Sequence, residues 1–108
     1  MAEEGLSVSG DDLIHQPLRL KIMAALHAER HGEPLEFSRL KTITQATDGN
    51  LGSHLSALEK AGYLEIAKDF VAKRPRTRAS LTAIGRQAFR RHVDYLRSVI
   101  EGIDTQEG

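Results

Sequence analysis

The side chains best suited to recognising another molecule are concentrated in the segment from Thr47 to Gly62. Its first half offers short hydrogen-bonding groups with little bulk, at Thr47, Asp48, Gly49, Asn50, Ser53 and His54. The Thr47 hydroxyl can accept a hydrogen bond from a free backbone N–H of a helical first turn, and Asp48 then places a negative charge at the positive end of the helix dipole. A helix that enters a DNA major groove presents such a polar first half to the base edges. An ordinary surface helix would fit these residues equally well, so the flanking sequence has to decide between the two.

Cationic side chains surround this segment in the sequence. Residues 37–98 contain 12 Lys or Arg against 5 Asp or Glu, whereas residues 1–36 contain 3 against 7 and residues 99–108 contain 0 against 3. The net charge of zero therefore hides a basic middle between two acidic ends. Such a middle fits a phosphate-binding surface, with a mixed solvated surface as the alternative. The cations expected at phosphates, or in a minor groove for the later ones, are Arg39, Lys73, Arg74, Arg76 and Arg78.

Metal and covalent chemistry find little support in the sequence. His27 and His31 have the i, i+4 spacing of two zinc ligands on one helix face, but no carboxylate is evidently placed to complete the site. The chain has no Cys, no Gly-rich phosphate loop, no nucleophile elbow and no HExxH motif. We therefore expect no enzyme activity, no metal and no cofactor.

The polar segment is positioned by an amphipathic helix. Leu51, Leu55 and Leu58 recur at i, i+4 and i+7, which forms one buried stripe. Gly62 suits the left-handed residue that ends such a helix. Gly49 destabilises the helix by roughly 1 kcal/mol relative to Ala, as does Gly52. The helix is therefore expected to rely on its packing, or on DNA, for its order.

The sequence predicts one domain over residues 11–102, which includes the polar helix, between a disordered arm (1–10) and a frayed tail (103–108). A helix from Pro17 to about Arg30 precedes a short helix (39–44) that Ser38 should cap. The second of these and the polar helix form a helix-turn-helix unit. After Gly62 the apolar period changes to two, which predicts a hairpin with Pro75 at its tip. A basic hairpin directly after a helix-turn-helix is a wing.

Apolar residues beyond the needs of one small core lie on the first long helix and on the last one, which should run from Thr82 to about Glu101. Exposed apolar area of this kind is rarely tolerated in soluble monomers, so a homodimer is expected. A monomer completed by the last helix folding back on its own core is the alternative. The residues expected at the dimer interface are Leu20, Met23, Tyr95, Leu96, Val99 and Ile100.

This order of elements resembles the winged helix-turn-helix transcriptional regulators of the MarR/ArsR type, in particular a small subgroup with little beyond the DNA-binding domain. The resemblance is carried by LIHQPLRLKIMAAL (13–26), FSRLKTITQATDGNLGSHLSALEKAGYLEI (37–66) and FVAKRPRTRASLTAIGRQAF (70–89). It implies an α+β, mostly α fold: a winged helix-turn-helix with a two-stranded β wing and a C-terminal dimerisation helix. It also implies a homodimer that binds a pseudo-palindromic duplex DNA operator and regulates transcription.

The resemblance leaves some points open. It places His54 beside the DNA surface, but this side chain could instead pack against the preceding helix and organise the turn. The cysteine metal-binding set of many ArsR-type sensors is missing, and no residue marks a pocket for a small-molecule effector. A winged-helix module that binds proteins without sequence-specific DNA binding is the alternative function. No apolar run approaches the roughly 20 residues of a membrane span, and no signal peptide begins the chain, so a cytoplasmic location is expected.

Overall fold

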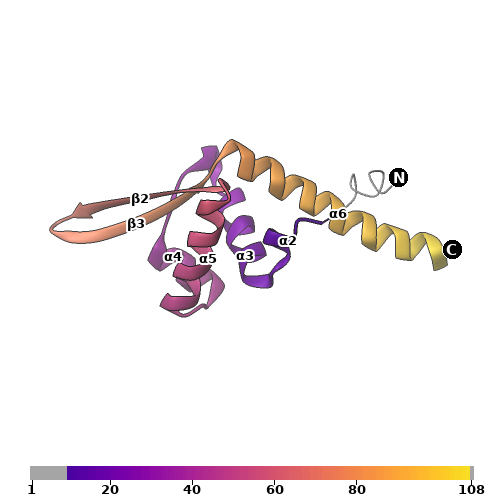
Figure 1. Ribbon diagram of the computed structural model, residues 1–108, viewed down its shortest axis with the longest axis horizontal. Helices are drawn as coiled ribbons and strands as arrows, with labels where there is room; N and C mark the ends of the chain where they lie inside the picture. Colours follow the sequence, from indigo (N-terminus) through magenta and orange to yellow (C-terminus); the bar gives the residue numbers. More distant parts are fainter. Residues whose placement is uncertain (1–9, 108) are drawn as a thin grey trace.

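The computed structural model describes the backbone of residues 10–107 and the side chains of residues 10–102. A cluster of helices forms the body, a long hairpin projects from one end, and the last helix extends to the other (Figure 1). The elements in chain order are α2 (Asp12–His15), α3 (Pro17–His27), the 3₁₀ turn η1 (Arg30–Gly32), β1 (Leu35–Glu36), α4 (Phe37–Thr44), α5 (Asp48–Lys60), β2 (Leu64–Val71), β3 (Arg74–Leu81) and α6 (Ala83–Glu107). The predicted α+β, mostly α winged helix-turn-helix is thus confirmed. Residues 1–9 of the predicted arm lie outside the described part of the chain, and its last residue, Gly10, lies close to the Tyr95 ring.

The core lies where α3, α4 and α5 meet the base of the sheet. Leu51, Leu55 and Leu58 of α5 are all buried there, as their spacing predicts. The prediction for Met23 is wrong: its side chain is fully buried among these residues, so it has no area to offer a second subunit. The reason is that α3 packs against α4, α5, α6 and β3. Together these elements bury more of the α3 surface than the single apolar stripe that the sequence predicted for the core.

The sheet has three antiparallel strands in the order β1-β3-β2. Leu35 and Glu36 form the short strand β1 and pair with Ala79 and Arg78. The wing pairs Leu64 with Leu81 at its base and Val71 with Arg74 at its end. Its tip is therefore Ala72-Lys73, both with positive φ (52° and 67°), and not Pro75, which lies opposite Phe70. Ladder hydrogen bonds alternate along an antiparallel pair, so the missing N–H of Pro75 falls at a position that needs none.

The helix ends follow local hydrogen bonds. The Thr47 hydroxyl accepts from Asn50 N (3.2 Å), and the Thr82 hydroxyl accepts from Gly85 N (3.0 Å), as expected. Ser38 is not the cap of α4, because β1 pairing holds Glu36 extended and the helix begins directly after it, at Phe37. Gln45, with φ of 59°, ends α4 in the left-handed conformation.

The helix α6 is longer than predicted. Its helical backbone continues to Glu107, through most of the predicted frayed tail, because adding turns to an existing helix is much easier than starting one. Its start is fixed by a contact that the sequence analysis missed: a Cβ on Gly85 would collide with the backbone carbonyl oxygen of Tyr63. Only glycine lets α6 approach the end of the α5–β2 connection this closely.

Candidate nucleic-acid interface

The outward side of α5 carries the predicted polar residues. About 100° separates successive residues of a helix, so Gly49 and Ser53 lie opposite the buried leucine stripe, and Asn50 lies toward the α3 side. All three are exposed. The surface also includes Ser56, one turn beyond Ser53, which the sequence analysis passed over although the same helical period identifies it.

Asp48 is committed to an ion pair inside the helix-turn-helix. Its carboxylate lies 2.7 Å from Nζ of Lys41 on α4, with both side chains well exposed. The pair connects the two helices at the point where α5 begins. An exposed pair of this kind contributes little stability. Its effect is to balance an acidic charge at the end of α5 where a phosphate would approach.

His54 is held by α3. Its Nδ1 accepts a hydrogen bond from Nε of Arg19 (2.9 Å), and burial, followed by the charge of Arg19, lowers the pKa of His54. The helix that holds it is α3 and not the preceding α4. Because Nδ1 accepts, the neutral ring carries its proton on Nε2 and can donate from there. His54 is therefore an oriented donor at the edge of the α5 surface.

A groove of about 490 Å³ separates α5 from the wing. Gly52 and Ser56 form its α5 side, and Ile66, Lys68 and Thr77 form its wing side. Side chains alternate along a strand, so Lys68 shares a face with Ile66, and this face is called the inner face of the wing. The sequence analysis did not select Lys68, although its even spacing from the buried Leu64 and the partly buried Ile66 could have identified it.

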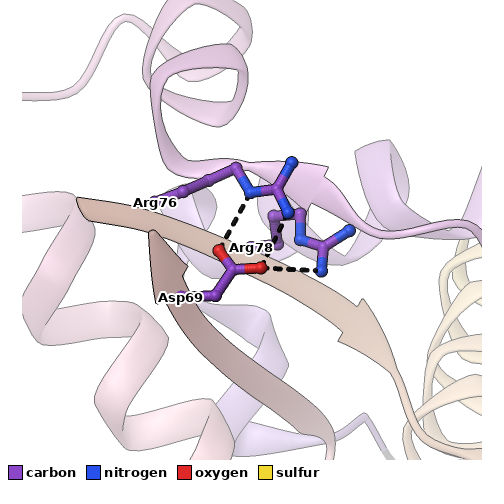
Figure 2. A network of polar contacts seen from close by, with 3 residues as sticks. All are labelled: Asp69, Arg76 and Arg78. Carbon is purple, nitrogen blue, oxygen red and sulfur yellow. Dashed lines mark hydrogen bonds and ion pairs between the residues drawn. The ribbon is translucent and has the colours of Figure 1, made fainter. Parts of the chain in front are cut away.

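The predicted arginines Arg76 and Arg78 lie on the opposite, outer face, where they contact Asp69 (Figure 2). Nε and Nη2 of Arg76 lie 2.9 and 2.7 Å from the two carboxylate oxygens, and Nη2 of Arg78 lies 3.5 Å from one of them. The hydrogen bond from Arg76 leads the effects that lower the pKa of Asp69. Register explains the cluster: Arg76 is directly opposite Asp69, and Arg78 is its diagonal neighbour. Two of the predicted phosphate contacts are thus partly neutralised.

The remaining predicted cations are exposed. Lys73 occupies the wing turn, Arg74 follows it, and Arg39 lies on the surface of α4. Over residues 10–102, none of the three forms an ion pair. They are thus the predicted cations whose charge no carboxylate of the described residues balances.

The predicted dimer residues other than Met23 are at least partly accessible. Leu20, Tyr95 and Leu96 are half-buried, whereas Val99 and Ile100 expose 42% and 61% of their surface. They lie on α3 and on the part of α6 that extends away from the wing (Figure 1).

The structure separates the two histidines that had the spacing of zinc ligands. His27 ends α3 and His31 has a positive φ of 57°, so the two do not share a helix face. Within the described part of the chain, no three His, Cys, Asp or Glu side chains come together as metal ligands would. None of the described helices has the length and apolar character needed to cross a membrane.

Several known proteins resemble this chain in sequence or in fold. An uncharacterized protein of Methanocaldococcus jannaschii is 32% identical over 92 residues, which cover 85% of this chain and 97% of that protein. The structure of a transcriptional regulator homologue from Pyrococcus horikoshii OT3 is similar with a TM-score of 0.80 and 33% identity, covering 94% of this chain and 98% of that one. At 21% identity, ytfH of Salmonella typhimurium shares the fold (TM-score 0.65; 99% of this chain, 91% of that one). Residues 18–100 match the family described as a winged helix DNA-binding domain, and the chain therefore belongs to this family of winged-helix regulators.

Proposed function

We propose that this chain is a sequence-specific double-stranded DNA-binding transcriptional regulator that acts as a homodimer. The observation that carries the proposal is the groove between α5 and the inner face of the wing. On duplex DNA, one sugar-phosphate strand separates the major groove from the neighbouring minor groove. A helix in the first and a wing in the second need a channel for that strand, and this groove supplies it.

Several groups that line the groove suit a phosphate strand. Lys68 offers an ammonium group, Ser56 and Thr77 offer hydroxyls, and Gly52 adds no side chain to the α5 side. Glu59 also lines the groove, so the charge of Lys68 is accompanied there by one carboxylate. Phosphate contacts position a protein, whereas base contacts give it specificity. With the strand in the groove, Asn50 and Ser53 on the outward side of α5 are the candidates for base contacts, and His54 donates from the flank.

Two considerations support the homodimer: the limited DNA contact area of one module, and the apolar side chains exposed on α6. A single module buries only about 600–1,000 Å² on DNA, which gives a short site. Two modules related by a two-fold axis would read half-sites about 34 Å apart. The exposed side chains of Val99 and Ile100, with Leu96 and Tyr95 behind them, form the apolar area that such an axis would cover.

Selection from a random duplex pool, followed by fluorescence anisotropy on the enriched sequence, tests the DNA proposal. We expect a pseudo-palindromic sequence to be enriched and to bind more tightly than unselected duplex, with affinity falling as salt rises. No binding even at low salt would refute the proposal. If no sequence is enriched, and all duplexes bind equally in a salt-sensitive way, sequence specificity is refuted.

Light scattering at micromolar concentration tests the dimer. We expect twice the chain mass of 11.9 kDa, and a mass near 11.9 kDa would refute it. Replacing Leu96 and Val99 by Glu should give a folded monomer with weak, salt-sensitive DNA binding. Arg97→Glu, which adds a like charge at an exposed neighbouring position, serves as the control that should remain dimeric.

A further inference from the structure

The tip of the wing exposes an unusual apolar pair. Phe70 leaves 74% of its surface exposed, more than any other large hydrophobic residue among residues 10–102. Pro75 lies directly opposite it on β3 and is also exposed. Both belong to the inner face, one pair beyond Lys68 and Thr77, and they thus continue the wing side of the groove toward the tip. Val71, exposed by 48%, points to the outer face instead.

The charges around this pair favour a polyanion as its partner. Lys68 lies next to it on the inner face, Lys73 occupies the turn, and Arg74, opposite Val71, begins β3 on the outer face. Of the nearby acids, Asp69 lies on the outer face and contacts two arginines, and Glu36 of β1 lines two surface hollows together with Pro75 and Arg76. Two lysines therefore flank the apolar pair, and both nearby carboxylates lie close to Arg76, which favours a polyanion over an acidic or neutral protein surface.

The turn is built for a narrow, right-handed twisted tip. Ala72 and Lys73 both have positive φ, which a two-residue turn of type I′ requires and which Asn-Gly would adopt at lower energy. An outlier of this kind points toward a functional site. Here the strained turn keeps the two strands close together and carries a lysine beyond the Phe70–Pro75 pair.

We propose that Phe70 and Pro75 form an apolar wedge that enters the DNA minor groove next to the major groove occupied by α5. The inference rests on the proposed DNA binding and adds a second recognition element to it. Proteins that use the minor groove often insert Phe or Pro between base steps and unstack them. Lys73 and Arg74 hold the flanking phosphates while the Phe70 ring inserts partly between two base pairs and stacks on a base.

The wedge would give the chain a sequence preference that depends on how easily the DNA is deformed. Pyrimidine–purine steps such as TA and CA/TG unstack most easily, so the chain prefers them where the wing reaches the minor groove. These positions lie outside the bases that α5 contacts. The preference comes from deformability and requires no hydrogen bond to a base.

The test compares Phe70→Ala with Val71→Ala, an exposed apolar neighbour on the opposite face. The probe is a duplex of about 30 base pairs that the wild-type chain enriches from a random pool, long enough for two half-sites. Phe70→Ala should weaken binding by at least about fivefold, the lower end of the effect of removing an aromatic ring that stacks on a base. The dependence of log K on log salt should keep its slope, because no charge is removed. Val71→Ala should bind as wild type does, and Phe70→Leu should retain most of the affinity.

Further measurements separate the possible outcomes. Selection with Phe70→Ala should lose the preference for flexible steps at the flanking positions while keeping the central half-sites. Equal affinities of Phe70→Ala and Val71→Ala, with wild-type binding intact, would overturn the wedge and leave the proposed function standing. No binding by the wild-type chain would instead refute the proposed function itself. A change in mass of Phe70→Ala by light scattering would overturn the wedge by assigning Phe70 to a contact between chains.

Discussion

Replacing Gly49 and Gly52 together by alanine should make the chain more stable and weaken its binding to duplex DNA. Nothing lies within 4 Å of a Cβ built at either position, so both methyl groups fit the free protein. Glycine in a helix interior is less favourable than alanine by roughly 1 kcal/mol, and somewhat less in the first turn. The double variant should therefore gain roughly 1–2 kcal/mol, and its melting temperature should rise by roughly 4–8 °C for each kcal/mol.

DNA binding should respond in the opposite direction. Gly49 lies on the outward side of α5, and Gly52 lies at the edge of the groove that is proposed to hold a phosphate strand. A methyl group forced into a close-packed contact typically costs roughly 1–3 kcal/mol, which corresponds to roughly a 5- to 150-fold loss of affinity. Thermal melts followed by circular dichroism and anisotropy titrations of the enriched duplex measure the two effects on the same samples.

Gly102→Ala is the matched control, because it also adds a methyl group in open space but lies on α6, far from α5 along the chain. It should raise the melting temperature and leave DNA affinity unchanged. A double variant that is more stable and binds DNA as tightly as wild type would refute the close approach of the α5 backbone. A fall in its melting temperature would refute the premise that these positions are open.

Three further changes test other parts of the structure. Gly85→Ala should lower the free energy of unfolding by more than about 2 kcal/mol, as overpacking does when the contact is the rigid carbonyl of Tyr63, measured by denaturant titration. Asp69→Asn should free its arginine partners and steepen the salt dependence of DNA binding by up to about 0.9, one further phosphate contact, measured by anisotropy at several salt concentrations. His92 is fully buried, and burial followed by the charge of His15 lowers its pKa. Its contribution to stability is therefore complete above about pH 6.5, the unfolded value, and is lost as the pH falls toward the lower folded value, measured by thermal melts at about pH 7.5 and about pH 5.

The last two of these predictions can each be checked with a second variant. Ser80→Ala lies elsewhere on β3 and should leave the salt dependence unchanged, in contrast to Asp69→Asn. An unaltered slope in the Asp69 variant would mean that its arginines do not reach DNA. His92→Gln should reduce the loss of stability at low pH, although His27, whose pKa is lowered chiefly by burial, will retain part of it. An unreduced loss would assign the pH dependence to other histidines.

Local rules determined most of the architecture from the sequence. The leucine stripe, the Thr47 and Thr82 caps and Gly62 define α5 and the start of α6 through interactions that span only a few residues. The change of period after Gly62 identified the wing, because alternation along a strand is also a local property. These signals were sufficient to predict the fold and the outward residues of α5.

Tertiary structure decided which side chains meet. The tip was misplaced because Ala72-Lys73 carries none of the Asn-Gly signal of a two-residue turn, and the turn sets the register that joins Asp69 to Arg76 and Arg78. Met23 is buried because several elements distant in sequence cover α3 on a wide face, which helical periodicity alone does not reveal. The same holds for Gly85 and the Tyr63 carbonyl: a contact between segments separated by a whole hairpin depends on how the strands pair, and strand pairing is a property of the folded chain.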